Sequence, residues 1–229
     1  MATKNLLKNS KAYYEDNDYY EIFSIAEDGE EKVANYLENV CKDKFVLDAG
    51  CGTGKFLNIL EKNSKKYIGI DLSDKQLEKA KRKSQEKTSE FICSNLSNIN
   101  LESNKVDLII CSWVLGTITN LEERNKCLGE LKRLLKSNGT IILIENDEYS
   151  EFEELRNRTN DTRTRDYNNW ILSNQFNIEK RINTYFAFDS IEIAKNCFEV
   201  IYGKEIASKI NSNKIEHKIV IFKYEKINL

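Results

Sequence analysis

The most constraining feature of this chain is the segment VLDAGCGTGKF, residues 46 to 56. It reads as a short apolar strand that ends in an acid, followed by three glycines at alternate positions and the start of a helix. Glycine has no Cβ, so a turn of this kind lets a ligand approach the backbone closely. Glycine-rich turns between a strand and a helix N-terminus bind nucleotide-like cofactors in open α/β sheets.

The position of the acid narrows the type of ligand. A dinucleotide fingerprint has the spacing G-x-G-x-x-G and faces a pyrophosphate. Here Gly50, Gly52 and Gly54 have the spacing G-x-G-x-G, and Asp48 stands two residues before the first glycine. Because a carboxylate repels a pyrophosphate, the pattern favours a cationic ligand. A nicotinamide-dependent oxidoreductase on the same kind of sheet is the weaker alternative.

Short apolar runs alternate with amphipathic helices around this turn. Such runs are typical of parallel strands buried on both faces, and they cover residues 45–49, 67–70, 90–93, 106–111 and 140–144. Ser73 and Gln76 form a capping box that begins one helix. Leucines between Leu121 and Leu135 have helical spacing, and Asn138-Gly139 predicts the turn that follows. With right-handed crossovers, the alternation predicts an α/β fold with a three-layer α/β/α sandwich.

The rest of the chain completes a single domain over residues 1–229. Residues 1–43 are a polar lead-in that becomes helical, and residues 44–147 form the alternating core. In residues 148–229 we expect a strand over 176–188, a helix of about fifteen residues from Ile191, and a final strand over 217–224.

Five blocks in this order resemble the motifs of class I S-adenosylmethionine-dependent methyltransferases. They are Asp48–Gly54, Tyr67–Ser73, Phe91–Leu96, Asp107–Leu115 and Leu131–Asn146. The resemblance implies a Rossmann-like, seven-stranded, mostly parallel sheet with an antiparallel last strand. It also implies S-adenosyl-L-methionine as the cofactor and S-adenosyl-L-homocysteine as the product.

The same resemblance assigns roles around the glycine turn. Asp48 would face the positive methionine end, and a side chain at Gly50 or Gly52 would collide with the ligand. Asp71 would accept from both ribose hydroxyls, or would instead be an acid that interacts with the helix dipole. Asn95 stands where many members have Asp, and with Leu96 it would hold the adenine. The cofactor-binding candidates are Asp48, Gly50, Cys51, Gly52, Gly54, Asp71, Leu72, Gln76, Asn95, Leu96, Cys111, Ser112 and Trp113.

Cys111, Ser112 and Trp113 follow the fourth strand, where the family's methyl donor meets its substrate. By this resemblance Trp113 would lie against the sulfonium by cation–π attraction; the alternative is that it packs in the core. Family members that methylate amino groups of DNA or of glutamine carry an Asn/Asp-Pro-Pro-Tyr/Phe motif here. This chain has no proline, which disfavours a nucleobase or amide nitrogen as the acceptor.

Two residues are candidates for catalysis. By resemblance to protein α-N-terminal methyltransferases, Asn146 at the end of the fifth strand and Asp161 before the next helix would hold and deprotonate an amine. The alternative is that both are polar surface residues. His217, the one histidine, is interpreted as a strand or surface residue rather than a base. No Asp/Asp/Asn metal trio is recognisable, so no metal is implied.

The acceptor is therefore expected to be a small molecule that receives the methyl group on nitrogen or oxygen. A protein N-terminal amine is the first alternative, and a non-catalytic protein that binds S-adenosylmethionine is the second. Residues 13–23 are rich in aromatic side chains, which are expected either to form a lid over the site or to pack on the sheet.

Composition bounds the remaining possibilities. The formal net charge of −2 gives no general attraction to nucleic acid, and lysine-rich residues 79–87 are interpreted as a solvated helix face. The sequence contains no apolar run of 18 residues, so it predicts no membrane-spanning helix. We expect a soluble cytoplasmic monomer or homodimer. The six cysteines are interpreted as free, buried side chains.

Overall fold

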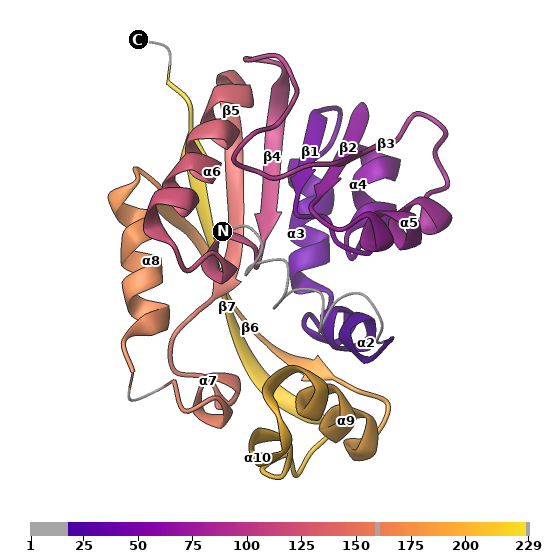
Figure 1. The fold of residues 1–229 in the computed structure, drawn as a ribbon, viewed down its shortest axis with the longest axis vertical. Helices are drawn as coiled ribbons and strands as arrows, with labels where there is room; N and C mark the ends of the chain where they lie inside the picture. Colours follow the sequence, from indigo (N-terminus) through magenta and orange to yellow (C-terminus); the bar gives the residue numbers. More distant parts are fainter. Residues whose placement is uncertain (1–17, 159–160, 228–229) are drawn as a thin grey trace. The chain divides into compact units, whose positions relative to one another are not determined.

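The computed structural model describes residues 18–158 and 161–227, which form two compact units (Figure 1). The sheet unit comprises the described residues within 34–145, 171–180 and 220–227. The aromatic unit comprises the described residues within 18–33, 146–170 and 181–219. The expected division of the chain into residues 1–43, 44–147 and 148–229 remains a prediction.

Seven strands form one sheet in the order β3-β2-β1-β4-β5-β7-β6. Their bounds are β1 Phe45–Ala49, β2 Lys66–Asp71, β3 Glu90–Cys93, β4 Val106–Ser112, β5 Leu135–Asn146, β6 Asn177–Ala187 and β7 Lys214–Glu225. β1 runs parallel to β2 and β4, as β2 does to β3 and β4 does to β5. The predicted α/β, Rossmann-like fold is confirmed.

The last strand is antiparallel to β5, as the hydrogen bonds between the two strands show. Asn138 N donates to Lys226 O over 2.8 Å, and Asp147 N donates to Lys218 O over 2.8 Å. Residue numbers therefore rise along β5 while they fall along β7. β6 and β7 each contribute residues to both units.

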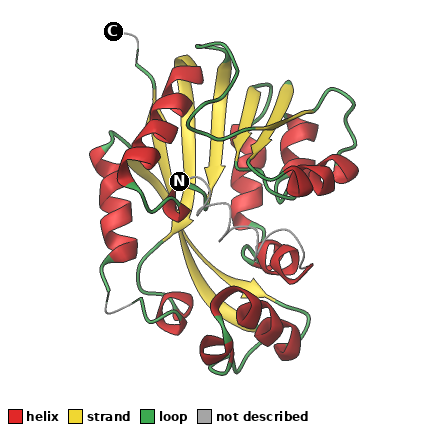
Figure 2. Cartoon of the chain, in the orientation of Figure 1, coloured by secondary structure: helices red, strands yellow, loops and turns green. Residues whose placement is uncertain are grey.

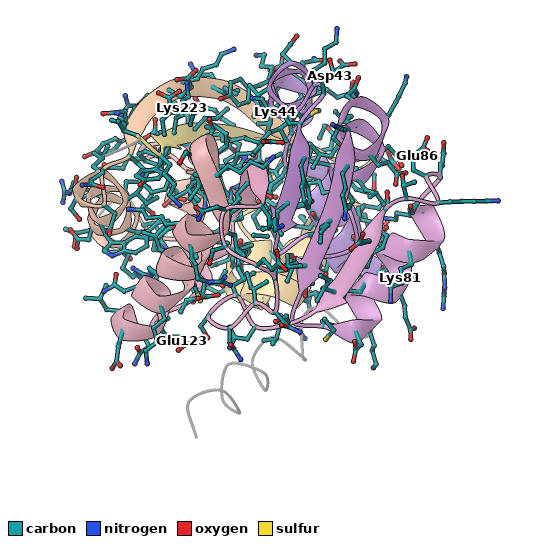
Figure 3. The ribbon with its side chains drawn as sticks, turned by 90° about the horizontal axis from the view of Figure 1, so that it is seen from above. Asp43, Lys44, Lys81, Glu86, Glu123 and Lys223 are labelled. Carbon is teal, nitrogen blue, oxygen red and sulfur yellow. The ribbon has the colours of Figure 1, made fainter. Side chains whose placement is uncertain are left out.

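Helices alternate with the strands of the sheet unit (Figure 2). Their bounds are α3 Lys32–Val40, α4 Leu57–Asn63, α5 Asp74–Lys83, the 3₁₀ turn η1 Leu115–Thr117 and α6 Leu121–Leu134. A further helix, α8 Arg163–Ser173, has residues in both units, most of them in the aromatic unit. The predicted cap of α5 is present, since Ser73 Oγ accepts from Gln76 N. Leu77 and Ala80 are buried whereas Lys81 projects into solvent (Figure 3), as expected of a solvated helix face.

The prediction for residues 135 to 139 was wrong. Leu135 begins β5 instead of ending α6, and Asn138-Gly139 lies inside the strand. The pairing of β5 with β4 is irregular at this point. Val106 pairs with Leu135 and Leu108 pairs with Thr140, so the register shifts between the two pairs. Asn138 has φ +62° there, a conformation that asparagine tolerates better than most residues.

The aromatic unit is organised around phenylalanine side chains. It contains α2 Asp18–Ala26, α7 Glu151–Leu155, α9 Ile191–Tyr202 and α10 Lys204–Ala207. The helix expected from Ile191 is thus two helices with Gly203 (φ +88°) between them. Phe23, Phe152, Phe186, Phe188 and Phe198 are buried in a common cluster. Phe23 and Tyr19 pack in or against this cluster, whereas Tyr13 and Tyr14 of the expected lid lie outside the described residues.

The cysteines are free, as predicted, but one exception corrects their expected burial. Cys93, at the end of β3, is exposed, and the other five cysteines are buried. None of the helices that the structure describes combines the length and hydrophobicity needed to cross a bilayer.

Candidate functional site

The glycine turn is built from positive backbone angles and short contacts. Gly50, Gly52 and Gly54 have φ of +80°, +55° and +81°, which L side chains rarely adopt. Gly50 N donates to Ile70 O over 2.7 Å, which fastens the turn to the end of β2. A Cβ on Gly50 would lie 2.3 Å from Val114 Cγ2. A side chain at position 50 was expected to collide with the ligand. It would already collide with Val114, so the protein itself requires glycine at this position.

Gln76 and Leu72 differ in how they meet this turn. Gln76 is buried, and its Oε1 would lie 2.8 Å from a Cβ on Gly52. Leu72 is among the exposed large hydrophobic residues. Cys51 is buried beside the turn, and desolvation raises the pKa of its thiol well above its usual range. Cys51 is therefore a neutral side chain at physiological pH.

Asp48 has a buried carboxylate, and one of its two oxygens has no hydrogen-bond partner. It is 2% exposed, and Oδ2 accepts from Tyr67 Oη over 3.2 Å. Oδ1 is buried and has no hydrogen-bond partner. Burial raises the pKa of Asp48 to about 7, against the opposing hydrogen bond from Tyr67. An unsatisfied buried carboxylate oxygen is costly, and a cationic ligand would satisfy it.

Asp71 holds the glycine turn and the start of α5 together. Its Oδ2 accepts from Gly52 N and its Oδ1 from Ser73 N, both over 2.9 Å. Burial raises the pKa of Asp71, while these backbone hydrogen bonds oppose the rise. The two carboxylate oxygens have about four lone-pair sites between them, so Asp71 can still accept a hydrogen bond from a ligand. The two roles predicted for Asp71 are therefore compatible, because it clamps the backbone and can still receive a diol.

The Asn95 side chain is engaged at both ends. Its Oδ1 accepts from Ser97 N over 3.0 Å, and its Nδ2 donates to Glu123 Oε1 of α6 over 3.3 Å. Leu96 beside it is 7% exposed. An Asp at position 95 would face the Glu123 carboxylate, whereas Asn donates to it. Glu123 therefore gives a physical reason for Asn where many family members have Asp.

The residues after β4 include a strained tryptophan. Trp113 has φ +53°, and its N donates to Ile144 O over 2.9 Å. Lys55 Nζ lies 4.1 Å from the centroid of the Trp113 ring, and Phe56 stacks on the same residue at 6.5 Å. Trp113 thus makes a cation–π contact, with Lys55 as the cation. Cys111 is buried and Ser112 is half-buried. Both lie inside β4 and not after it, which corrects the expectation from the sequence.

Within the aromatic unit, Asn146 meets His217. The His217 Nε2 lies 2.9 Å from Asn146 Oδ1, and its Nδ1 lies 3.0 Å from the backbone oxygen of Glu27. The Asn146 backbone oxygen accepts from Asn168 Nδ2 over 3.2 Å. His217 is 0% exposed on β7, so it is the predicted strand residue and not a surface one. Sequence reasoning missed its contact with Asn146, because 71 residues separate them.

Asp161 is held elsewhere in the aromatic unit. It forms an ion pair with Arg163, and its Oδ1 also accepts from Arg163 N over 3.0 Å. These hydrogen bonds hold the pKa of Asp161 below its ordinary value. It borders a surface pocket that is otherwise lined by Glu148, Tyr149, Glu153, Arg158, Thr164 and Arg165. A carboxylate in this state is a poor base, which lowers the case for Asp161 as the group that deprotonates an amine.

Comparison with known proteins bears on both the fold and the site. A model of the methyltransferase domain matches residues 47–143. An uncharacterized protein of Methanocaldococcus jannaschii is 34% identical over 103 residues, covering 45% of this chain and 41% of that protein. The ubiquinone/menaquinone biosynthesis C-methyltransferase of Campylobacter jejuni is 35% identical over 111 residues, covering 45% of each protein. The chain spans less than half the length of these curated relatives.

Solved structures extend the similarity in fold over most of the chain. The YcgJ protein from Bacillus subtilis superposes with a TM-score of 0.60 at 17% identity, covering 86% of this chain and 98% of that one. The N-methyltransferase NodS from Bradyrhizobium japonicum, solved with S-adenosyl-L-homocysteine, has a TM-score of 0.57 at 13% identity, covering 99% and 97%. At these identities the likeness establishes the fold alone.

Proposed function

We propose that this chain, whose residues 47–143 match the methyltransferase domain model, is a class I S-adenosylmethionine-dependent methyltransferase that transfers a methyl group from S-adenosyl-L-methionine to a nitrogen or oxygen atom of a small-molecule acceptor. The observation that carries the cofactor assignment is the buried, unpartnered Oδ1 of Asp48 beside the glycine turn. A sulfonium and an ammonium are positive groups that such an oxygen would attract. A pyrophosphate is repelled by it, which argues against a nicotinamide cofactor.

The residues of the sheet unit suit the parts of this cofactor. Asp48 would face the methionine end, and the backbone of Gly50 and Gly52 would lie along the ligand. Asp71 would accept from the ribose hydroxyls with the lone pairs that Gly52 and Ser73 leave. Leu96 would pack on the adenine. When bound, the cofactor supplies an activated methyl group, and the protein contributes positioning and the exclusion of water.

Asn146 is our candidate for a contact with the acceptor. It ends β5, two residues after Ile144, which pairs with Ser112 at the end of β4. In open α/β sheets ligands bind beyond the carboxyl ends of the strands. Its amide can hold an N–H or O–H group of an acceptor without carrying charge.

The alternatives differ in the acceptor. A protein N-terminal amine needs a base for its ammonium form, and the ion pair between Asp161 and Arg163 weakens that candidate. Since one relative is named a C-methyltransferase, a carbon acceptor belongs in any screen. A protein that binds the cofactor without turnover is the remaining alternative.

Calorimetry with S-adenosyl-L-homocysteine tests the cofactor assignment. We expect micromolar affinity for the wild type and weaker binding for Asp71→Ala. Lys81→Ala, a change at an exposed position on α5, is the matched control and should bind as the wild type does. Wild-type protein that is folded but does not bind the compound would contradict the assignment.

A screen for S-adenosyl-L-homocysteine release then tests the acceptor. It should contain amines, alcohols, carboxylic acids, carbon acids and short peptides with free N-termini. Turnover of amines or alcohols supports the proposal, and turnover of peptides alone favours the protein substrate. Cofactor binding with no turnover across the panel would favour the non-catalytic alternative.

A further inference from the structure

The surface pocket beside Asp161 is lined by two short stretches of chain, residues 148–158 around α7 and residues 161–165 at the beginning of α8. Both stretches belong to the aromatic unit. Two of the lining residues, hereafter the pocket arginines, are Arg158, which follows α7, and Arg165, in the first turn of α8. Two guanidinium groups at one pocket attract an anion.

The way in which α7 ends places Arg158 at the pocket. Arg158 N donates to Glu153 O over 2.8 Å, and Asn157 N donates to Glu154 O over 2.9 Å. Asn157 between them has φ +56°. These two hydrogen bonds around a left-handed residue form a Schellman motif, in which asparagine sometimes replaces glycine. The motif fixes the backbone of Arg158, so its side chain starts from a defined position beside the pocket.

A buried hydrogen bond ties the first turn of α8 to α7. Thr164 Oγ1 donates to Glu153 Oε2 over 2.7 Å, and Glu153 is 1% exposed. Arg165 follows Thr164 directly and is exposed. Positive charge in the first turn of a helix interacts unfavourably with the helix dipole, whereas an anion there is stabilised. A bound anion would therefore suit both the helix and its arginine.

Other arginines already pair with two of the acidic side chains around the pocket. Glu153 forms an ion pair with Arg156, and Asp161 forms one with Arg163. Within the described part of the chain, no carboxylate forms an ion pair with either pocket arginine. Glu148 is the third acid of the lining, and no ion pair engages it among these residues. Positive charge therefore exceeds negative charge among the unpaired groups of the pocket.

The surroundings of Arg158 strengthen its attraction for an anion. Its side chain is half-buried, and burial lowers the pKa of the guanidinium. Arg156 and Arg163 lower this pKa further, while Glu153 and Asp161 oppose the change. A guanidinium that has lost water and lies near other positive groups gains more from a negative partner than one in open solvent.

We propose that this pocket binds an anionic group, a phosphate or a carboxylate, between Arg158 and Arg165. The planar guanidinium fork matches the oxygens of either group through paired N–H···O hydrogen bonds. Glu148 on the same lining would accept from a hydroxyl or amino group beside the anion, which favours a small ligand that carries both. This binding site is additional to the proposed methyl transfer and does not depend on it.

Nuclear magnetic resonance titrations of the ¹⁵N-labelled full chain test the site without cofactor or acceptor. Inorganic phosphate and acetate are the two probes, and sodium chloride keeps the ionic strength constant. We expect saturable shifts of the Thr164 and Arg165 amides and of Arg158 Nε–H, with a Kd of about 1–10 mM for at least one probe. The probe that binds more tightly identifies the anionic group. Shifts that do not saturate with either probe would overturn the proposal.

Substitutions that each change one charge test the position of the anion. Arg158→Gln and Arg165→Gln should each weaken binding of the preferred probe by about tenfold or more. Arg82→Gln removes the same charge from an exposed position on α5 of the sheet unit and is the matched control. Glu148→Gln should strengthen binding by about threefold, because its carboxylate no longer repels the anion.

Thermal unfolding shows whether each variant is folded. Should Arg158→Gln unfold, Arg165→Gln decides, because it changes an exposed side chain and leaves the buried contact of Thr164 with Glu153 in place. Equal weakening in Arg82→Gln and in a folded variant of either pocket arginine would show a response to net charge alone and overturn the proposal. Unchanged or weaker binding in Glu148→Gln would place the anion outside this pocket, with the same consequence.

Discussion

The hydroxyl of Tyr67 donates to Oδ2 of Asp48 over 3.2 Å, and this is the hydrogen bond that the structure provides to a carboxylate only 2% exposed. Asp48 is the next-to-last residue of β1, and its register partner on β2 is Gly69. Tyr67 reaches Asp48 beside Gly69, where a Cβ would lie 2.9 Å from Tyr67 Oη. Glycine at position 69 of β2 thus leaves space for the Tyr67 hydroxyl, which donates to Asp48 on β1.

Binding of S-adenosyl-L-methionine should be coupled to the loss of a proton below pH 7. Burial raises the pKa of Asp48 from 3.8 to about 7, so the ligand-free protein carries this proton in mildly acidic solution. A positive ligand favours the ionised form and lowers that pKa. Affinity should therefore rise about tenfold per pH unit up to about pH 7 and then level off. Calorimetry in two buffers with different ionisation enthalpies measures the released proton.

The sign for folding is opposite to the sign for binding. Since the folded-state pKa of Asp48 is raised, its contribution to stability is present below about pH 4 and is lost as the pH rises to about 7. Asp48→Asn should remove both dependences. A wild-type affinity that stays flat between pH 5 and pH 7 would contradict the linkage.

Removal of the Tyr67 hydroxyl should move this transition to higher pH. The hydrogen bond from Tyr67 lowers the pKa of Asp48 against the effect of burial, so Tyr67→Phe raises it further. The pH at which affinity levels off should then increase, by about one unit for a lost hydrogen bond of about 1.4 kcal/mol. An unchanged or lower midpoint, measured by the same titration, would show that Tyr67 does not act on Asp48 in solution.

The clamp at Asp71 can be separated from its ribose contact by a thermodynamic cycle. In Asp71→Asn one oxygen still accepts, but the NH₂ group meets a second backbone N–H, so stability should fall by roughly 1–3 kcal/mol. S-adenosyl-L-homocysteine and its 2′,3′-dideoxy analogue are then titrated into both proteins. If Asp71 binds the ribose, removal of the hydroxyls costs the wild type far more affinity than it costs the variant. Equal costs would leave Asp71 with the clamp alone.

Gly50→Ala should destabilise the fold even without ligand. The new Cβ would lie 2.3 Å from Val114 Cγ2, at a residue with φ +80°. We expect a loss of roughly 2–4 kcal/mol in urea unfolding, of which about 1–2 kcal/mol is backbone strain. Combining it with Val114→Ala should recover part of the loss, because the clash is relieved but the strain is not. Strict additivity of the two changes would argue against the contact.

Much of the fold could be predicted because strong local signals agree with it. Short apolar runs predicted the observed bounds of β1, Phe45–Ala49, and of β3, Glu90–Cys93. The expected burial on both faces was wrong for β3, whose residues are exposed or half-buried. The turn predicted at Asn138-Gly139 does not end the strand. A turn signal is local, whereas β5 pairs with β4 and β7 both before and after these two residues. Tertiary pairing overrides local preference in such a case.

The site residues could be predicted from the sequence only where they stand close together along the chain in a recognisable motif. Asp48, the glycines and Asp71 follow one another in a compact pattern, and the structure brings them together. Val114, Glu123 and His217 are set by contacts with residues 64, 28 and 71 positions away. No periodicity in a single sequence marks such pairs, and their roles became visible only from distances.

Asn95→Asp should weaken the adenine side of the site through Glu123. The substitution places a carboxylate where Nδ2 now donates to Glu123 Oε1 over 3.3 Å. Both residues are half-buried, so the repulsion should cost about 1 kcal/mol, or about fivefold in affinity for S-adenosyl-L-homocysteine. Glu123→Gln added to this variant supplies a donor to the new carboxylate and should restore binding. Glu123→Gln alone leaves Asn95 as a donor to the Gln oxygen and serves as the control. If the double variant binds no better than Asn95→Asp, the loss comes from the adenine contact itself, and Glu123 does not explain why this chain has Asn at position 95.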